Sequence, residues 1–428
     1  MPSYRAPRGT RDLLPEVRAG LSRLEGIARS LAARYGYREM EIPLFEQTAV
    51  FERGMGETTD VVEKELFRLD PRTEEAESWA LRPEATAGIV RAYVQHGMQT
   101  LPQPVKLSVL GPMFRYDRPQ AGRYRQFWQW DAEAIGDPGP AVDAEVIEMG
   151  LRFYIEAGVA DVQVLVNSIG DSACRPAYLR QLKEYFGRHE AELADTDRQR
   201  LETNPLRLLD SKDPAMAALI AAAPKISEGL CDACSAHFAA VLVHLDAVAV
   251  PYRVEPTLVR GLDYYARTAF EYYRRGAEGQ QQALGGGGRY DGLAEVLGGR
   301  PTPAIGFALG LDRVLLALEE GGEAQARSAA PLAVVVGADP ADTVARLRVA
   351  SLLRAEGLAV RAELAPRKLG RQLEAASRDH AHFAVIIGDE LGDGHVQLKD
   401  LEAGTQRLVA LEDLAKDLAR AAKSHHHG

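Results

Sequence analysis

Two stretches with strand-like patterns flank a short polar segment in the first third of the chain. Residues 109–116 are mostly apolar and aromatic, and residues 125–135 alternate roughly with period two. The polar segment between them, 117–123, carries Pro119 and Gly122, which are residue types that favour turns. The pattern therefore predicts a β-hairpin with a long loop.

Several inward positions of this hairpin are polar or charged. They are Arg115, Gln129 and Glu133 in the strands, and the loop adds Arg118 and Arg123. Charges of both signs inside a sheet are costly unless they meet partners or ligands. A solvated hairpin with surface ion pairs is the alternative, but it would leave uncovered the interleaved aromatic residues, Phe114, Phe127, Trp128 and Trp130. The pattern thus favours a hairpin that serves a ligand site.

The remaining periodicity divides the chain into segments. An amphipathic helix is expected after Pro15, followed by a strand over 37–44 in which Pro43 indicates a sheet edge. Helical patterns with proline breaks predict a helical insertion, and strand–helix alternation near the end predicts a small α/β domain with a mainly parallel core. The expected divisions are a main domain in two parts (1–170 and 251–320), the insertion (171–250), a linker (321–330) and the α/β domain (331–422).

Bulk properties restrict the class of protein. The chain has 428 residues, 46% of them hydrophobic, enough for two or three globular domains with ample core. A net charge of -10 gives no global basic surface for polyanions, so any nucleic-acid contact must come from local patches. We find no signal-peptide pattern and no run of apolar residues long enough to span a membrane, so we expect no membrane association. With only three cysteines, a reducing cytoplasm is the simple inference.

A second chemical cluster lies further along the chain. Residues 257–270 read TLVRGLDYYARTAF, and residues 285–293 read GGGGRYDGL. Gly261 lets the backbone bend where Arg260 must project inward, and Tyr264 and Tyr265 offer ring faces and hydroxyls that suit a flat polar ligand. The four consecutive glycines either allow close approach to a ligand or form a flexible turn; they lack the lysine of a phosphate-binding loop.

A third segment, 304–318, reads AIGFALGLDRVLLAL and predicts a strand of small residues followed by a helix that starts near Asp312. Arg313 then stands where the helix dipole disfavours a cation. This indicates either a bound anion or ring, or a simple pairing with a neighbouring acid.

Together these segments resemble a known family. The sequence FRYDRPQAGRYRQF at 114–127 resembles the second signature motif of class II aminoacyl-tRNA synthetases, in its histidyl-tRNA synthetase form. The segments RGLDYY and GGGGRYDGL resemble the two histidine-specific signatures of that family, in which Arg260, Arg289 and Tyr290 match. The resemblance extends from Tyr4 to about Ala422, including NPLRLLDSK at 204–212 in the insertion. It implies an α+β catalytic domain with a mainly antiparallel sheet and a C-terminal α/β anticodon-binding domain.

The resemblance also implies roles for individual residues. Arg115 would hold the α-phosphate of ATP, Arg313 the nucleotide, and Arg260 both the substrate carboxylate and the α-phosphate. The implied histidine-binding residues are Glu84 and Thr86, for the α-ammonium, with Gln129, Glu133, Tyr264, Tyr265, Gly287 and Tyr290. Arg118 and Arg123 would meet ATP or the tRNA acceptor end, and the exposed-looking basic cluster with Arg367 and Lys368 would be either a solvated face or a tRNA phosphate contact.

The implied activity is a histidine–tRNA ligase that uses L-histidine, ATP with Mg²⁺ and tRNA(His), needs no organic cofactor, and forms a homodimer. The nearest rival is the histidine-binding regulatory subunit of ATP phosphoribosyltransferase, a paralogue of this catalytic domain. That paralogue usually lacks the C-terminal domain and part of the arginine set. A generic nucleotide-binding protein or kinase is a second rival, but no phosphate-loop motif or hydroxyl-activating set supports it.

The cysteines form an incomplete metal motif. Cys231 and Cys234 make a C-x-x-C pair, with His237 three positions on, whereas a structural zinc site requires four ligands. His237 and Cys174 would complete a set, but nothing in the sequence brings them near. We therefore expect buried or incidental thiols and no structural zinc.

Overall fold

The computed structural model describes residues 4–56, 59, 61–70, 73, 77–118, 122–211, 213–262, 264–275, 283–322, 331–339 and 343–425. The chain forms two compact units, Met1–Ala326 and Arg327–Gly428. Most of the expected linker, residues 323–330, lies outside the described residues, as does the middle of the hairpin loop, 119–121.

The larger unit is built on an eight-stranded sheet in the described part of the chain, with strand order β1-β5-β6-β11-β10-β9-β7-β8. Only the outermost pairs, β1 with β5 and β7 with β8, are parallel; all inner pairs are antiparallel. The expected mainly antiparallel α+β fold is therefore confirmed. The strands are β1 (Arg38–Glu39), β5 (Val105–Phe114), β6 (Gln126–Ile135), β7 (Val162–Ser168), β8 (Tyr252–Val254), β9 (Ala266–Arg274), β10 (Gly285–Arg289) and β11 (Ala304–Gly310).

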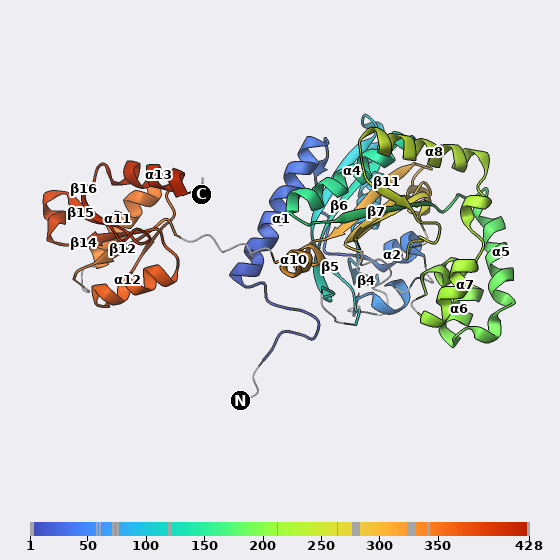
Figure 1. Cartoon of the computed structure of the whole chain (residues 1–428), viewed down its shortest axis with the longest axis horizontal. Helices are drawn as coiled ribbons and strands as arrows, with labels where there is room; N and C mark the ends of the chain where they lie inside the picture. The colour runs from blue at the N-terminus through green and yellow to red at the C-terminus, as the bar shows by residue number, and fades with distance from the viewer. Residues whose placement is uncertain are drawn as a thin grey trace. The chain divides into compact units, whose positions relative to one another are not determined.

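One face of this sheet is covered by a layer of long helices. This layer contains α1 (Pro15–Arg34), α4 (Pro140–Ala157), α8 (Asp232–Ala247) and α10 (Leu311–Glu320). Figure 1 shows α4 and α8 side by side over the strands. Trp130, Ala132 and Ala134 of β6 point into this core, so the alternate residues of β6 face the opposite side. The alternation predicted for the hairpin thus gives β6 one apolar face, which lies in the core, and one polar face on the opposite side.

The opposite face is partly covered by α3 (Thr86–Gln95) and α9 (Leu293–Val296), which share a second core cluster with β5 and Ile135. A small antiparallel sheet lies beside it, with strands β2 (Phe45–Gln47), β3 (Arg68–Leu69) and β4 (Trp79–Leu81), next to α2 (Thr48–Met55). The expected strand over 37–44 is shorter than predicted. Only Arg38–Glu39 pairs with β5 as a strand, and the backbone N–H of Met40 adds one further bond to the carbonyl of Ser108.

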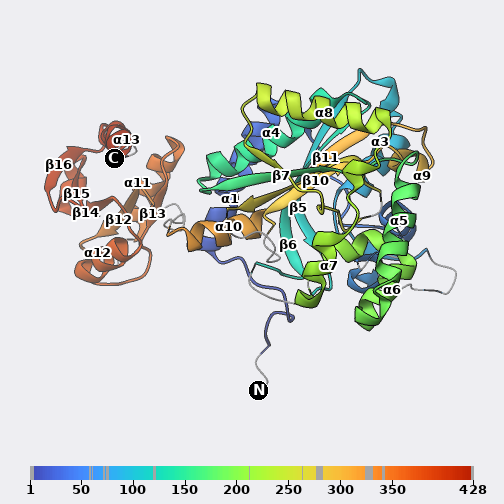
Figure 2. The ribbon, with the colours of Figure 1, turned by 45° about the vertical axis from the view of Figure 1, so that its right-hand side comes forward.

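The helical insertion has its own hydrophobic core, which runs from Tyr178 to Ile226. Its helices are α5 (Arg175–Gly187), α6 (Asp195–Thr203) and α7 (Ala217–Ala222), and Figure 2 shows them as a separate group beside the sheet. The expected insertion, 171–250, also includes α8, which packs with α4 and contributes Val241 and Leu245 to the main core.

The smaller unit contains a five-stranded sheet of order β13-β12-β14-β15-β16, parallel across its first three strands and antiparallel across the rest. The strands are β12 (Ala333–Gly337), β13 (Val360–Ala362), β14 (Phe383–Ile387), β15 (His395–Asp400) and β16 (Gln406–Ala410), with helices α11 (Thr343–Ala355), α12 (Leu369–Arg378) and α13 (Leu414–His425). Among the described residues no single helix is long and apolar enough to cross a membrane, although the bent pair Pro214–Glu228 and Asp232–Ala247 meets that test together.

The glycine run forms a strand, β10, in the middle of the large sheet, and not a turn. A Cβ on Gly287 would lie 2.0 Å from the carbonyl oxygen of Gly306 and 2.7 Å from Phe270 Cζ. Neither atom can move without disturbing a neighbouring strand. Glycine is required here by the close approach of the flanking strands.

We predict that Gly287→Ala lowers the free energy of unfolding by about 1–3 kcal/mol or more, because the added methyl overpacks the sheet. Gly292→Ala is the matched control, since a Cβ there meets nothing within 4 Å. Denaturant unfolding of both variants checks the prediction, and equal stability of the two would contradict it.

Candidate active site

The polar face of β6 carries a buried carboxylate at its centre. Glu133 is 1% exposed. The hydroxyl of Thr86 donates to its Oε1 at 2.6 Å, and the hydroxyl of Tyr290 donates to its Oε2. Burial raises the pKa of Glu133 to about 8, against the effect of these two donors. The site therefore holds an acceptor that gains most from a ligand carrying an N–H or a positive charge.

A second buried carboxylate, Glu84, lies just before α3. It accepts the backbone N–H groups of Thr86 at 2.8 Å and Ala87 at 2.9 Å. The helix begins at Thr86, and Glu84 binds its first free amides. Burial raises the pKa of Glu84, with Arg115 among the groups that oppose the shift.

Three tyrosines lie beside Glu133. The rings of Tyr264 and Tyr265 have centroids 4.5 Å apart, and Tyr264 meets Tyr290 edge-on at 5.6 Å. Burial is the first cause that raises the pKa of each, so all three hydroxyls stay protonated and able to donate. The tyrosines provide flat apolar surfaces with polar ends next to an acid.

Two further polar residues of β6 are buried on the same face. Gln129 is 8% exposed and Asp131 is fully buried. Gln129 Oε1 and both carboxylate oxygens of Asp131 have no hydrogen-bond partner among the described residues. Burial, followed by the nearby charges of Glu133 and Glu84, raises the pKa of Asp131 far above its usual value. Unsatisfied buried groups of this kind are typical of functional sites.

Arg260 lies against the tyrosines. Its guanidinium pairs with Glu271 of β9 and is 5.5 Å from the centroid of the Tyr265 ring. Burial opposes its charge, but the neighbouring Glu271 and Tyr265 outweigh burial and raise the pKa of Arg260. Glu271 also accepts the hydroxyl of Tyr273. Glu271 was not among the residues predicted from the sequence: it is the one acid in β9, but its pairing with Arg260 appears only in the folded structure.

The other two arginines of the predicted set lie within electrostatic reach of each other. Burial lowers the pKa of Arg313, and the positive charges of Arg123 and Arg115 lower it further. Arg313 donates to the carbonyl of Ala283, and Arg115 Nε donates to the carbonyl of Pro83 at 2.9 Å. Arg123 pairs with Asp117 at 2.8 Å. Cations that destabilise one another in this way make a site for a polyanion.

Glu271 links this group to Arg260, because it pairs with Arg260 and its charge also acts on Arg313. The structure therefore brings the arginines, the two acids and the tyrosines into one neighbourhood. Gly287 of β10 lies two strands from Glu133, across β11. Arg289, which matched a family signature, instead points into the core and pairs with the buried Asp143.

The remaining predicted residues are exposed. Arg118 lies in the hairpin loop, where its backbone N–H donates to Asp117 at 2.6 Å. In the smaller unit, Arg367 and Lys368 are exposed just before α12. Their expected contacts with tRNA stay predictions.

The antiparallel sheet, with buried acids and gathered arginines on one face, defines a class II aminoacyl-tRNA synthetase. A family profile described as histidyl-tRNA synthetase matches residues 9–314, and one described as an anticodon binding domain matches residues 331–420. The chain belongs to the histidyl-tRNA synthetase family, as its motifs had indicated.

Relatives support this membership along the whole chain. A histidine–tRNA ligase of Moorella thermoacetica is 45% identical over 406 residues, covering 95% of each chain. The crystal structure of apo S. aureus histidyl-tRNA synthetase matches with a TM-score of 0.80 and 36% identity, covering 97% of this chain and 100% of that one. A structure described as an ATP phosphoribosyltransferase regulatory subunit/histidyl-tRNA synthetase from Bacillus halodurans C shares the fold, with a TM-score of 0.60, 22% identity and coverage of 84% of this chain and 92% of that one.

The raised pKa of Glu133 predicts a pH dependence of stability. Between its ordinary pKa of 4.5 and about 8, folded Glu133 keeps a proton that the unfolded chain has released. Its contribution to the free energy of unfolding therefore falls as pH rises through this window, by up to about 1.4 kcal/mol per pH unit. We expect Glu133→Gln to make the melting temperature of the ligand-free protein fall less steeply between about pH 5 and pH 8 than in the parent.

The matched control is Glu39→Gln, which alters an exposed carboxylate. It should follow the parent. If the melting temperature of Glu133→Gln also has the same pH dependence as the parent, the pKa of Glu133 is not raised.

Proposed function

We propose that this chain is a histidine–tRNA ligase. It joins L-histidine to ATP as histidyl-adenylate and then transfers the histidyl group to the 3′ end of tRNA(His). The observation that carries the proposal is the buried Glu133, flanked by Tyr264, Tyr265 and Tyr290 and adjoining the arginine group. An acid enclosed by aromatic rings suits imidazole, and arginines suit the carboxylate and phosphates that must meet it.

Glu133 recognises the ring of the amino acid. An imidazole N–H can donate to its carboxylate, and binding such a donor favours the ionised form that burial alone disfavours. The tyrosine rings cover the flat faces of the imidazole, and Gln129 supplies its unpartnered oxygen to the substrate. Glu84 and Thr86 hold the α-ammonium, whose charge compensates the buried carboxylate of Glu84. Gly287 leaves room for the neighbouring strands to approach closely.

The first chemical step joins two anions. A histidine carboxylate oxygen attacks the α-phosphorus of ATP, and the bond to the departing pyrophosphate breaks. Negative charge grows on the phosphate oxygens, so catalysis rests on positioning and fixed cations. Arg115 holds the α-phosphate, Arg313 the nucleotide, and Arg260 bridges the carboxylate and the α-phosphate. Mg²⁺ enters with ATP as part of the substrate.

The second step transfers the histidyl group to RNA. The terminal ribose hydroxyl attacks the carbonyl carbon of the adenylate, and AMP leaves. Arg118 and Arg123 in the hairpin loop are assigned to ATP or the acceptor end. In the smaller unit, the exposed Arg367 and Lys368 are assigned to tRNA phosphates, because cations placed before a helix start bind a backbone without reading its bases.

The working form is assigned as a homodimer in the cytoplasm. The edge strand β1 is one candidate surface for a second copy, and the exposed apolar residues Leu44, Phe45 and Trp79 at the three-stranded sheet are another. A reducing compartment keeps the three thiols, which are free cysteines in the structure, unpaired.

Exchange of labelled pyrophosphate into ATP tests the reaction. We expect exchange that depends on L-histidine and needs no tRNA, because adenylate formation is reversible on the enzyme. A regulatory subunit of ATP phosphoribosyltransferase would bind histidine without exchange. Histidine binding without exchange would therefore favour the regulatory subunit. The match of residues 331–420 to the anticodon binding domain argues against that candidate.

Arg260→Ala should reduce histidine-dependent exchange by about 100-fold or more, since it removes a buried cation from the developing phosphate charge. The variant should still fold, because the carboxylate of Glu271 loses Arg260 but still accepts a hydrogen bond from the hydroxyl of Tyr273. Arg260→Lys should not restore activity if the guanidinium binds its oxygen ligands in a bidentate manner, which an ammonium group cannot do. Arg274→Ala, which removes an exposed ion pair on β9, the strand that carries Glu271, is the control. Normal exchange by the Arg260 variants, with unchanged circular dichroism, would overturn the assigned role.

A further inference from the structure

Four metal-ligand side chains meet at the base of the helical insertion, outside the site described above. They are Asp171, Cys174, Cys231 and Cys234, and their ligand atoms all lie within 4.8 Å of one another. We propose that they bind one structural Zn²⁺ ion, which fastens the two ends of the insertion to the catalytic unit.

The four residues come from two loops of the same design. Asp171 and Cys174 are three positions apart, as are Cys231 and Cys234. Each loop therefore has the spacing of a C-x-x-C motif, and in the first loop an aspartate stands at the position of the first cysteine. Paired loops of this spacing supply the ligands of many zinc sites, in which thiolates and carboxylates both bind. Here the structure brings Cys174 to the C-x-x-C pair, which the sequence could not show.

The dimensions of the group suit a tetrahedral ion. Cys174 Sγ lies 3.8 Å from Asp171 Oδ1. Zinc–sulfur bonds of about 2.3 Å place neighbouring ligand atoms of a tetrahedron about 3.8 Å apart. The wider pairs must close by about 1 Å or less, which side-chain rotation of cysteine can supply. His237, the other sequence candidate, is held elsewhere, with Nε2 2.9 Å from Asp143.

Two of the thiols lie at helix N-termini. Cys174 directly precedes α5 and Cys231 directly precedes α8, so two helix N-termini direct their partial positive charge at the group. Cys174 and Cys234 are buried. Gly170 has φ +65°, and a Cβ there would lie 2.8 Å from Cys174 Sγ, so only glycine leaves room for this thiol.

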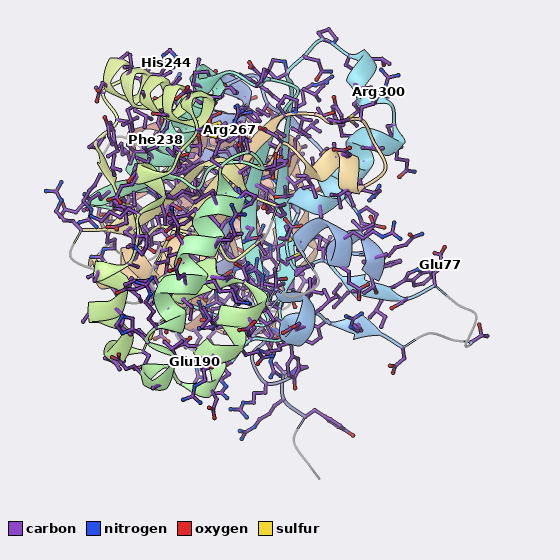
Figure 3. All side chains as sticks on the ribbon, turned by 90° about the vertical axis from the view of Figure 1, so that its right-hand side faces the viewer. Glu77, Glu190, Phe238, His244, Arg267 and Arg300 are labelled. Atoms are coloured by element: carbon purple, nitrogen blue, oxygen red, sulfur yellow. The ribbon has the colours of Figure 1, made fainter. Side chains whose placement is uncertain are left out.

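A second layer of contacts orients the carboxylate. Arg267 Nη2 donates to Asp171 Oδ2 at 3.2 Å, which leaves Oδ1 directed at Cys174. Outer partners of this kind fix ligand orientation in metal sites. Figure 3 labels Arg267 near α8, the helix that carries Phe238 and His244. The Arg267 guanidinium also offsets part of the negative charge of three thiolates and a carboxylate around a dication.

The group is joined to the histidine-binding tyrosines. Arg175 donates to the carbonyl of Gly170 at 2.9 Å and to the carbonyl of Tyr265 at 2.6 Å. Arg267 lies two residues beyond Tyr265 and its backbone N–H also donates to Gly170, at 2.7 Å. An ion at Asp171 and Cys174 therefore stabilises both the start of the insertion and the loop that carries Tyr265.

The test measures metal content in the full chain, purified under reducing conditions with no added metal. We expect about one zinc per chain by mass spectrometry of metals, and a drop of at least 10-fold in zinc affinity for Cys174→Ser and Cys234→Ser. Asp232→Asn is the matched control, since this exposed carboxylate lies between the two cysteines of the C-x-x-C pair. It should retain the metal. All variants keep the terminal histidines, so their background binding cancels.

Cobalt substitution of the parent protein keeps the proposal testable if the cysteine variants misfold. Tetrahedral cobalt bound to thiolates gives a sulfur-to-metal charge-transfer band, which histidines alone cannot give. We expect that band, with loss of zinc on chelation lowering the melting temperature. Zinc no higher in the parent than in Cys174→Ser, a cobalt spectrum without thiolate character, iron in place of zinc, or a Cys231–Cys234 disulfide in the fresh protein would each overturn the proposal.

Discussion

A carboxylate kept away from water organises the larger unit. Glu133 stays inside because it alternates on β6 with Trp130, Ala132 and Ala134, which are fixed in the helix-covered core. Moving Glu133 outward would move those side chains out of that core. The packing of the whole sheet thus offsets the cost of burying this acid, which remains a hydrogen-bond acceptor. The tyrosines and Thr86 are arranged around that constraint.

The cations are kept apart from this acid by partners of their own. Arg260 pairs with Glu271, Arg115 donates to a backbone carbonyl, and Arg123 pairs with Asp117. These partners satisfy part of the hydrogen-bonding capacity of the guanidinium groups and so weaken their attraction to the buried acids Glu133 and Glu84. Arg313, whose neighbours are other arginines, has its pKa lowered by burial and by them. A bound anion would relieve this repulsion between the arginines.

Local patterns predicted the antiparallel hairpin, the amphipathic α1 and the alternating polar face of β6, because each depends on residues close in sequence. The glycine run could not be assigned from the same rules. Its strand conformation depends on Phe270 and Gly306, which approach from two other strands. The same limit applies to Glu271, whose partner Arg260 lies eleven positions away across a loop, and to Cys174, which is far in sequence from Cys231. Tertiary contacts decide these cases.

The segment that contains α5, α6 and α7 begins and ends at nearly the same point of the catalytic unit. At that point Asp171 and Cys174 meet Cys231 and Cys234. A segment whose ends coincide can change its length or its content without altering the strands on either side of it. A change within this helical module therefore need not shift the register of β7 against β9. The helical insertion is thus attached to the rest of the unit at one small, chemically specific joint.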